Sequence, residues 1–389
     1  MDHAAMTAAT VPSRRTLGGS LVDRLVAHVW WVFTLWLAAI GTIHALIWAG
    51  HGWVWFPEGA HVLFSSSWAH LYAQHNDLQI GPLTFVAVAP IVFGLPPHMG
   101  EVVAIVLMSG AGLIVLREIR SLVTVRTKQT DRTFLVAGLC LLVLWAELAV
   151  TYAHADDVLA IVLTVFALRA LRSDRPYVGA VLLALAADAK PWAVMFVPLF
   201  LLADRSSRAR ALLVWLLTVV LAWLPFYLGD HRTLTAGAFR IPNNLASSLR
   251  VLGENAASTP SWDRPAQLLL GTSLGLVLML RGRWSAVVVV AVAARILLDP
   301  AVHSYYDAGL LAGAVLCDLA LLGGPIPLLS VSAVIVLYLP MFPLHAQPHL
   351  YGLIRSAYLA TVILALTVLP DESLRRPAGG LDTVGYGAG

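Results

Sequence analysis

The chain has 389 residues, of which 59% are hydrophobic and only 12% are charged, against roughly 25% charged residues in a soluble domain. Its mean hydropathy is +0.79. The formal charge of +3 comes almost wholly from arginine, since Lys128 and Lys190 are the only lysines. This composition excludes an ordinary soluble domain, and the basic balance indicates membrane loops rather than nucleic-acid binding.

Apolar runs of about 15 to 20 residues recur along the chain, long enough or nearly long enough to cross a hydrocarbon core of roughly 30 Å as helices. Lipid cannot satisfy free backbone groups, so helices are expected and strands are not. The positive-inside rule assigns six basic clusters to the cytoplasm: 14–24, 117–132, 169–175, 205–210, 281–283 and 375–376. The expected spans are 28–49, 100–116, 133–150, 158–171, 211–228, 266–280, 284–297, 306–322, 326–343 and 352–369.

The two ends of the chain are expected to be cytoplasmic tails. Residues 1–27 carry arginines but are followed by no small-residue cleavage site of the signal-peptide kind, so this tail is expected to stay uncleaved. Residues 371–389 form the second tail, and residues 28–370 form a single transmembrane domain.

The apolar stretch 82–96 does not fit as an ordinary span, because it is short and bounded by prolines. If it crossed the membrane, the following span would end outside and leave the basic cluster 117–132 there, against the positive-inside rule. It is therefore expected to be an interfacial helix within a long first external loop, 51–98.

The stretch 177–203 begins and ends at basic clusters and carries Lys190-Pro191 at its middle. Two helices of about 13 residues reach only about 20 Å each, so a short hairpin with Lys190 at its tip is expected. Counting this hairpin as two spans gives about 12 spans. The predicted fold class is all-α, a polytopic transmembrane helix bundle in the cell membrane.

Many of the remaining polar residues then fall on the extracytoplasmic side. Such a group can bind ligands, shuttle protons or hold an anion. By loop, these residues are His51, His61, His70, His75 and Asp77; His154, Asp156 and Asp157; His231, Arg240, Asn243 and Asn244; His303 and Asp307; His345 and His349.

Asp77 precedes the proline-started helix at Pro82. One interpretation is that it caps that helix, since aspartate near an N-terminus satisfies free amides. The other is a general base, because a carboxylate near the membrane surface can take a proton from an acceptor hydroxyl.

Asp156 and Asp157 follow His154 at the start of a predicted helix, and capping is again one interpretation. Either could instead position a sugar hydroxyl or a metal. Adjacent residues on a helix point about 100° apart, so at most one is expected to face a shared cavity.

Lys190 lies deep in an apolar hairpin, where a charge costs roughly 2.5–3.5 kcal/mol at the bilayer centre. It is interpreted as a phosphate ligand, or as a lysine neutralised by Asp188. Arg240 and Arg295 are further candidates for an anion. His303 and Asp307 are one helical turn apart and could hydrogen-bond, or could form a cap and part of an aromatic belt.

No metal or cofactor is expected from the sequence. Cys140 and Cys317 lie in apolar runs, and Pro348 interrupts the spacing of His345 and His349. No P-loop, nucleophile elbow or dinucleotide fingerprint is present. A site on the outer face cannot draw on cytoplasmic nucleotide sugars, whereas a polyprenyl phosphate presents an activated sugar at the membrane surface.

The segments 75–83 and 187–192 resemble the GT-C superfamily, specifically the polyprenol-phosphate-mannose-dependent transferases of glycosyltransferase family 87. The resemblance implies that Asp77 is the catalytic aspartate of the first external loop. It implies a polyprenyl-phosphate sugar donor, usually of mannose, and a lipid or glycan acceptor, with catalysis on the extracytoplasmic side. The sequence Gln79-Ile80-Gly81-Pro82 departs from the Tyr-Pro-Pro type common in many relatives.

Within this interpretation the polar residues receive roles in one outer site. Asp77 is the base, and Lys190, Arg240 and His303 bind the donor phosphate. The residues expected to position the sugar or acceptor are His75, His154, Asp156, Asp157 and Asp307.

Two other functions stay open at this point. A transporter or lipid flippase would bind its substrate at Lys190 and predicts related halves with charges near the midplane. A catalytically silent membrane subunit predicts that the polar residues do not converge.

Overall fold

The computed structural model describes residues 21–124 and 127–370. Within these residues all regular elements are helices, and one isolated β-bridge joins Pro242 and Ser258. The all-α fold class is therefore confirmed for this part of the chain. Residues 1–20 and 371–389 of the two predicted tails lie outside it, while the end of the first tail forms a short helix, α1 (Leu21–Ala27).

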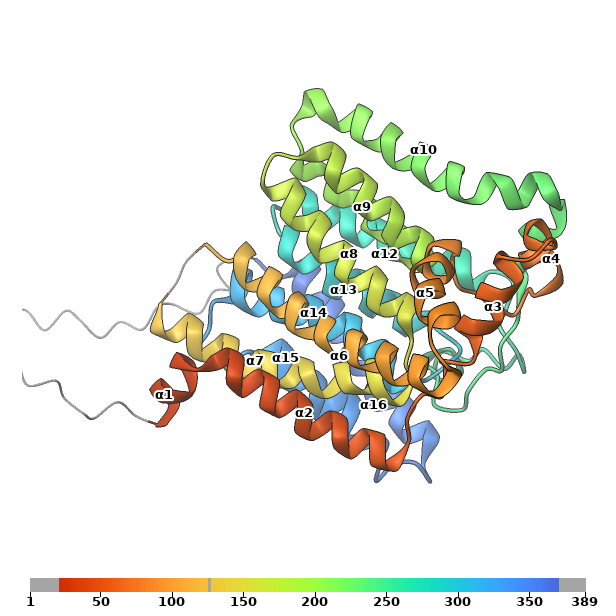
Figure 1. The fold of residues 1–389 in the computed structure, drawn as a ribbon. Helices are drawn as coiled ribbons and strands as arrows, with labels where there is room; N and C mark the ends of the chain where they lie inside the picture. Colours follow the sequence, from red (N-terminus) through yellow and green to blue (C-terminus); the bar gives the residue numbers. More distant parts are fainter. Residues whose placement is uncertain (1–20, 125–126, 371–389) are drawn as a thin grey trace, which may run out of the picture.

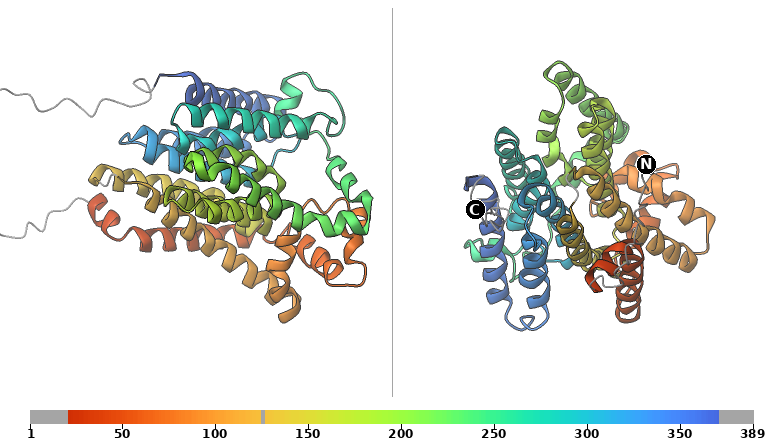
Figure 2. Two further views of the ribbon diagram at one scale, coloured as in Figure 1. Left: turned by 90° about the horizontal axis from the view of Figure 1, so that it is seen from above. Right: turned by 90° about the vertical axis from the view of Figure 1, so that its left-hand side faces the viewer.

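Within residues 21–124 and 127–370, six helical segments are long and apolar enough to cross a membrane, which makes the chain a membrane protein by helix length and composition. Most long helices run roughly along one direction (Figures 1 and 2). The six are α2 (Val29–Ile47), α6 (Pro97–Leu122), α7 with η2 (Lys128–Thr151), α10 (Arg205–Gly229), α14 with its flanking turns (Ser304–Leu322) and α16 (Pro348–Val368).

The other predicted spans are also helical, although shorter or more polar. They are α8 (Ala155–Arg172), α9 (Pro176–Ala189), η3 (Pro191–Leu202), α12 (Asp263–Leu280), η5 with α13 (Trp284–Leu298) and α15 with η8 and η9 (Leu328–Met341). Each expected span thus coincides with a helix, and the ends differ by a few residues. The total of about 12 membrane crossings stays a prediction.

Burial separates a central layer from a rim. In α13, the ten consecutive residues from Val287 to Ile296 are buried, and α14 (Asp307–Cys317) is buried throughout. In α10, by contrast, only Ala211 and Phe226 are buried, although the helix is apolar. An apolar helix with an exposed apolar surface is what contact with lipid tails requires.

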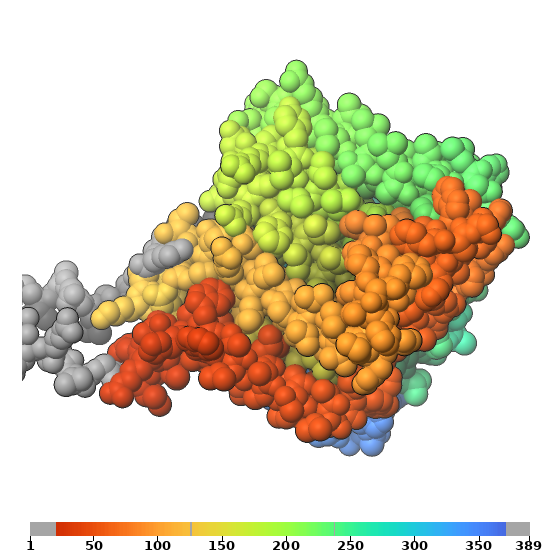
Figure 3. Space-filling model, in the orientation of Figure 1, coloured from red at the N-terminus to blue at the C-terminus, as the bar shows by residue number. Residues whose placement is uncertain are grey.

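The first external loop gathers at one end of the bundle, and α1 lies at the other (Figure 1). The loop contains α3 (Trp55–Leu63), α4 (Leu71–Gln74) and α5 (Pro82–Gly94). Figure 3 shows this loop, in orange, covering part of that end. The predicted short helix at 82–96 is confirmed as a separate element, α5.

The predicted hairpin is confirmed, with Lys190 as the extended residue between α9 and η3. The second arm is a 3₁₀ helix, in which Pro191 and Pro198 lack amide donors. At about 2.0 Å per residue in a 3₁₀ helix and 1.5 Å in an α-helix, the 12-residue arm is about as long as the 14-residue arm. Lys190 at the tip therefore lies about as far from the start of α9 as from the end of η3.

The first loop is joined to the hairpin just beside Lys190. The Gly81 amide donates to the Ala189 carbonyl at 3.2 Å, and the Leu83 amide donates to the Asp188 carboxylate at 3.0 Å. Asp188 therefore caps α5 from across the fold, while Gly81, at the N-cap position, makes no side-chain cap. The interpretations that Asp77 caps this helix and that Asp188 neutralises Lys190 are both wrong.

The contact between the loop and the hairpin leaves no room for a side chain at Gly81, because an added Cβ would lie 1.2 Å from the Asp188 carbonyl oxygen. Gly81→Ala is expected to lower the free energy of unfolding by at least the roughly 1–3 kcal/mol of an overpacked site. Thermal unfolding of the purified protein in detergent would measure this. Gly110→Ala is the matched control, since no heavy atom lies within 4 Å of its added Cβ, and equal melting temperatures for the two variants would contradict the role of this contact.

Candidate functional site

A cluster of buried and partly buried polar and aromatic side chains occupies the end of the bundle that carries the first loop. We call it the outer cluster. Its members come from the start of α8, the hairpin tip, the end of α13, the turn before α14 and the outer part of α16: His154, Asp156, Asp157, Lys190, Trp192, Arg295, His303, Tyr305, Tyr306, Asp307 and Arg355.

Lys190 is held by both carboxylates of the first turn of α8. Its ammonium donates a hydrogen bond to Asp156 and lies 3.4 Å from Asp157 Oδ2. The Trp192 indole donates to Asp157 Oδ1 at 2.9 Å. The expectation that only one carboxylate would face a shared site is wrong, because the ammonium and the indole approach the helix together and each hydrogen-bonds a different carboxylate.

The two carboxylates are not simple helix caps. His154 holds the N-cap position of α8 and makes no side-chain cap, whereas Asp156 and Asp157 lie in the first turn. Anionic side chains are favoured there by the helix dipole. Asp157 Oδ2 also keeps no hydrogen-bond partner, so it is a buried acceptor that a ligand hydroxyl could use.

A ring nitrogen of His154 and oxygens of Asp156 and Asp157 lie within 4.8 Å of one another, a geometry that a metal ion could share. The ammonium of Lys190 already lies against the same carboxylates. Any metal would therefore compete with a cation that the chain itself supplies.

Aromatic rings connect Lys190 to His303. His154 is 3.3 Å from Asp156 and stacks on Tyr305 at a centroid distance of 4.3 Å. Tyr305 in turn stacks on His303 at 5.4 Å. The three rings thus form a stack beside the carboxylates, in which Tyr305 is buried and the imidazoles of His154 and His303 are partly exposed.

His303 lies just before the 304–322 segment, and burial lowers its pKa to about 4, with the nearby His154 and arginines acting in the same direction. The imidazole is therefore neutral near pH 7. It can donate one hydrogen bond to a phosphate oxygen, but it adds no positive charge there.

Arg355 is the residue of this cluster that the sequence interpretation missed. It is fully buried and lies 4.0 Å from Asp307, and its three guanidinium nitrogens have no hydrogen-bond partner. The signal was an arginine inside an apolar span, which is costly and marks a functional-site hypothesis. The expected hydrogen bond between His303 and Asp307 does not form, because Asp307 faces Arg355 instead.

Arg295 has partners of its own within the outer cluster. It lies 3.5 Å from Asp299 and 4.3 Å from the Tyr306 ring centroid, with Trp192 also in cation–π range at 5.4 Å. Its charge is therefore shared between a carboxylate and two aromatic faces.

The first loop packs against the outer cluster through its backbone and through Phe56. Gly52 donates to the Tyr152 carbonyl at 2.7 Å, and the Phe56 ring lies 6.4 Å from that of His154. Asp77 lies on an exposed turn of this loop, and its carboxylate makes no hydrogen bond or ion pair within the described residues.

Two other predicted site residues also lie outside the outer cluster. His75 pairs with Glu58 at 3.4 Å. Arg240 lies exposed on the 230–262 loop, without a polar side-chain contact in the described part of the chain. The structure therefore brings together His154, Asp156, Asp157, Lys190, His303 and Asp307, and leaves Asp77, His75 and Arg240 apart from them.

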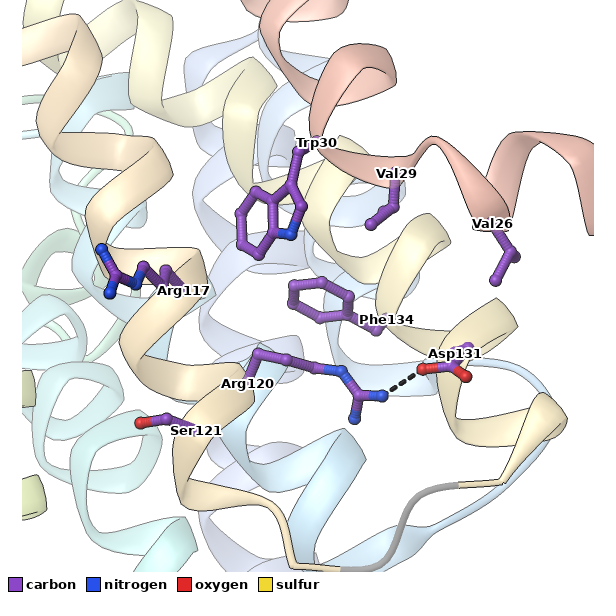
Figure 4. Close-up of a pocket in the computed structure, with 8 residues that line it drawn as sticks. All are labelled: Val26, Val29, Trp30, Arg117, Arg120, Ser121, Asp131 and Phe134. Carbon is purple, nitrogen blue, oxygen red and sulfur yellow. Dashed lines mark hydrogen bonds and ion pairs between the residues drawn. The ribbon is translucent and has the colours of Figure 1, made fainter.

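Two cavities in the described part of the chain are lined by none of Asp77, Lys190 and His303, the residues of the predicted shared cavity. One of these cavities lies between α1, α2, α6 and α7 (Figure 4). The other is a small apolar space of about 10 Å³ beside Trp192 and Phe196. The shared cavity, with its sideways opening to lipid, stays a prediction.

No family model, no curated protein and no solved structure matches this chain. Its function must therefore be argued from the residues of the outer cluster.

Because Lys190 pairs with the buried carboxylates of Asp156 and Asp157, we expect substitutions at Lys190 and Asp156 to have large, non-additive effects on the free energy of unfolding. Lys190→Met leaves two buried carboxylates without their cation, and should lower the free energy of unfolding by about 3–5 kcal/mol. Thermal unfolding of Lys190→Met, Asp156→Asn and the double variant would test this. The double variant should be more stable than Lys190→Met alone, and strictly additive losses would contradict the pairing.

The lowered pKa of His303 predicts a loss of stability in mild acid. Its folded pKa of about 4 lies below the ordinary histidine pKa of 6.5, so between these values the unfolded chain binds a proton that the folded chain does not. Stability should therefore fall as the pH drops from about 6.5 towards 4. In His303→Asn the melting temperature should fall less over this range, whereas the exposed control His345→Asn should follow the unsubstituted protein.

Proposed function

We propose that the chain is an inverting glycosyltransferase of the GT-C type, with a fold of about 12 spans. It transfers a sugar, expected to be mannose, from a polyprenyl phosphate to a lipid or glycan acceptor on the extracytoplasmic face of the cell membrane. The observation that carries this proposal is the convergence of buried carboxylates, cations and stacked aromatic rings at the loop-bearing end of the bundle. No metal or other cofactor is proposed.

The aromatic and acidic parts of the outer cluster suit a sugar. The partly exposed imidazoles of His154 and His303, both stacked on the buried Tyr305, would hold the apolar side of a pyranose. Asp157 Oδ2, which makes no hydrogen bond although it lies 3.4 Å from the Lys190 ammonium, can accept from a sugar hydroxyl. A ligand of this kind would satisfy a buried acceptor that otherwise costs roughly 1–3 kcal/mol.

The cationic part suits the departing phosphate. Lys190 shares its charge with Asp156 and Asp157, so the net charge of these three groups is already negative. Arg355 faces a single carboxylate and hydrogen-bonds nothing. We therefore add Arg355 to Lys190 and His303 as a group that stabilises negative charge on the phosphate as the sugar leaves.

Asp77 is the proposed base. Its carboxylate makes no polar contact with the described residues, and four residues later the Gly81 amide bonds to the hairpin at Ala189, next to Lys190. In the reaction the acceptor oxygen attacks the anomeric carbon and its proton passes to Asp77. The bond from carbon to the phosphate oxygen breaks, and the polyprenyl phosphate departs with the electron pair, so the configuration inverts.

A transporter remains the second candidate because of the charge buried in the Lys190 hairpin. A silent subunit is less well supported, since it predicted that the polar residues would not converge. The decisive experiment uses purified protein in lipid vesicles with several polyprenyl-phosphate sugars and a lipid extract as acceptor. Release of polyprenyl phosphate that depends on both donor and acceptor supports transfer, and movement of the intact donor across the bilayer without release supports transport.

The role of Asp77 can be tested separately from folding. Asp77→Asn should leave the melting temperature nearly unchanged, because the carboxylate has no partner to lose. Turnover should fall by roughly 10²- to 10⁴-fold, the usual contribution of a positioned general base. Glu58→Gln, on the same loop, is the matched control, and near-normal turnover by Asp77→Asn would move the role of base to Asp157 or Asp307.

A further inference from the structure

A compact loop packs against α16 at the end of the bundle that carries the first loop (Figure 1). It comprises residues 243–257 and includes the short helix α11 (Ser248–Val251). Its ends are joined, since the Asn243 amide donates to the Ala257 carbonyl at 3.0 Å and the flanking Pro242 and Ser258 form the isolated β-bridge. Compact loops with closed ends are frequently functional. We call this segment the 243–257 loop.

The 243–257 loop is held mostly by its own polar groups. The Asn243 side chain donates to the Glu254 carbonyl at 3.2 Å, and the Ser247 hydroxyl donates to Asn243 Oδ1 at 2.6 Å. Within the described residues, one hydrogen bond joins the loop to another element, from the Asn244 amide to the Pro300 carbonyl at 2.9 Å. A unit with internal hydrogen bonds and a single external one can open locally while the bundle stays folded.

The loop contacts two elements beside Arg355. At Gly352, one turn before Arg355 on the same face of α16, an added Cβ would lie 2.9 Å from the Ala246 carbonyl oxygen. Pro300, which accepts the external hydrogen bond, directly follows Asp299, and Asp299 lies within electrostatic range of Arg355. Arg355 itself is fully buried. Access to its guanidinium group from outside therefore requires the loop to move.

Both sides of this contact carry hydrogen-bonding groups without a partner. The Ser248 hydroxyl, two residues after Ala246, is buried and makes no hydrogen bond, and the three guanidinium nitrogens of Arg355 make none either. The guanidinium has an ion pair with Asp307 at 4.0 Å. Buried polar groups of this kind are rare and costly unless a ligand or water satisfies them. A hydroxyl and a guanidinium group that can both donate favour an anion, and a phosphate accepts from both.

We propose that the 243–257 loop is a lid over the donor phosphate, and that its Ser248 hydroxyl binds this phosphate together with Arg355. The loop opens to admit the phosphate to Arg355 and then closes, so that Ser248 donates a hydrogen bond to it. This inference rests on the proposed function, in which Arg355 stabilises the departing phosphate. It adds a second ligand for that phosphate and the element that controls access to it.

Ligand binding tests the role of Ser248. The probe is farnesyl phosphate, a short polyprenyl phosphate, and farnesol is its uncharged counterpart. Native mass spectrometry of the full chain in detergent should show tighter binding of farnesyl phosphate. Ser248→Ala should weaken it about tenfold, as for one lost hydrogen bond to a charged group, without lowering the melting temperature, because this hydroxyl has no protein partner to lose. Ser206→Ala, at an exposed serine near the start of α10, is the control and should keep full affinity.

Hydrogen exchange tests the movement of the loop. Without added ligand, the amides of residues 243–257 should exchange through local opening, faster than those of the buried helix α13. Farnesyl phosphate should slow exchange in the loop, because the bound phosphate joins Ser248 to Arg355. The same concentration should slow it less in Ser248→Ala.

Three results would overturn the lid: equal affinity for farnesyl phosphate and farnesol, full affinity for farnesyl phosphate in Ser248→Ala, and loop exchange that farnesyl phosphate leaves unchanged. Failure of the proposed function looks different. If the vesicle assay shows no sugar transfer while Ser248→Ala still weakens farnesyl phosphate binding, the lid stands and glycosyl transfer is wrong. If transfer proceeds and Ser248→Ala binds farnesyl phosphate normally, transfer stands and the lid is wrong.

Discussion

The end of the bundle that carries the first loop depends on the ion pairing of Lys190 with Asp156 and Asp157. A lone ammonium at the tip of an apolar hairpin is costly in a membrane, and so are two buried carboxylates at a helix start. Together they offset one another, and the pairing fixes the hairpin against α8. The aromatic stack depends on the same ion pairs. His154 lies beside Asp156, Tyr305 stacks on His154, and His303 stacks on Tyr305.

The hairpin tip also positions the first loop. Asp188 holds the start of α5, and the Gly81 amide bonds to the backbone one residue before Lys190. The tip thus joins the loop that carries Asp77 to the buried charges of the bundle.

Charge is not confined to one end of the molecule. At the opposite end Arg169 pairs with the buried Glu118, and Arg283 donates to the Leu366 carbonyl at 2.6 Å at the end of α16. Asp318 caps α15 through the Leu329 and Ser330 amides. These groups make hydrogen bonds to helix ends or close ion pairs, whereas Arg355 and Asp157 Oδ2 in the outer cluster make only longer ion pairs, at 4.0 Å and 3.4 Å, and no hydrogen bond, which favours the outer cluster as the place of ligand binding.

The sequence by itself determined the helices and the hairpin, because apolar length, prolines and arginine positions are local properties of the chain. The tertiary structure alone decided the partners. Lys190 pairs with Asp156, 34 residues away, and not with Asp188, two residues away. Arg355 faces Asp307 for the same reason. A buried charge pairs with a counter-charge on a side chain that helix packing brings near it. The packing of helices that are distant in the sequence cannot be predicted from a local sequence pattern.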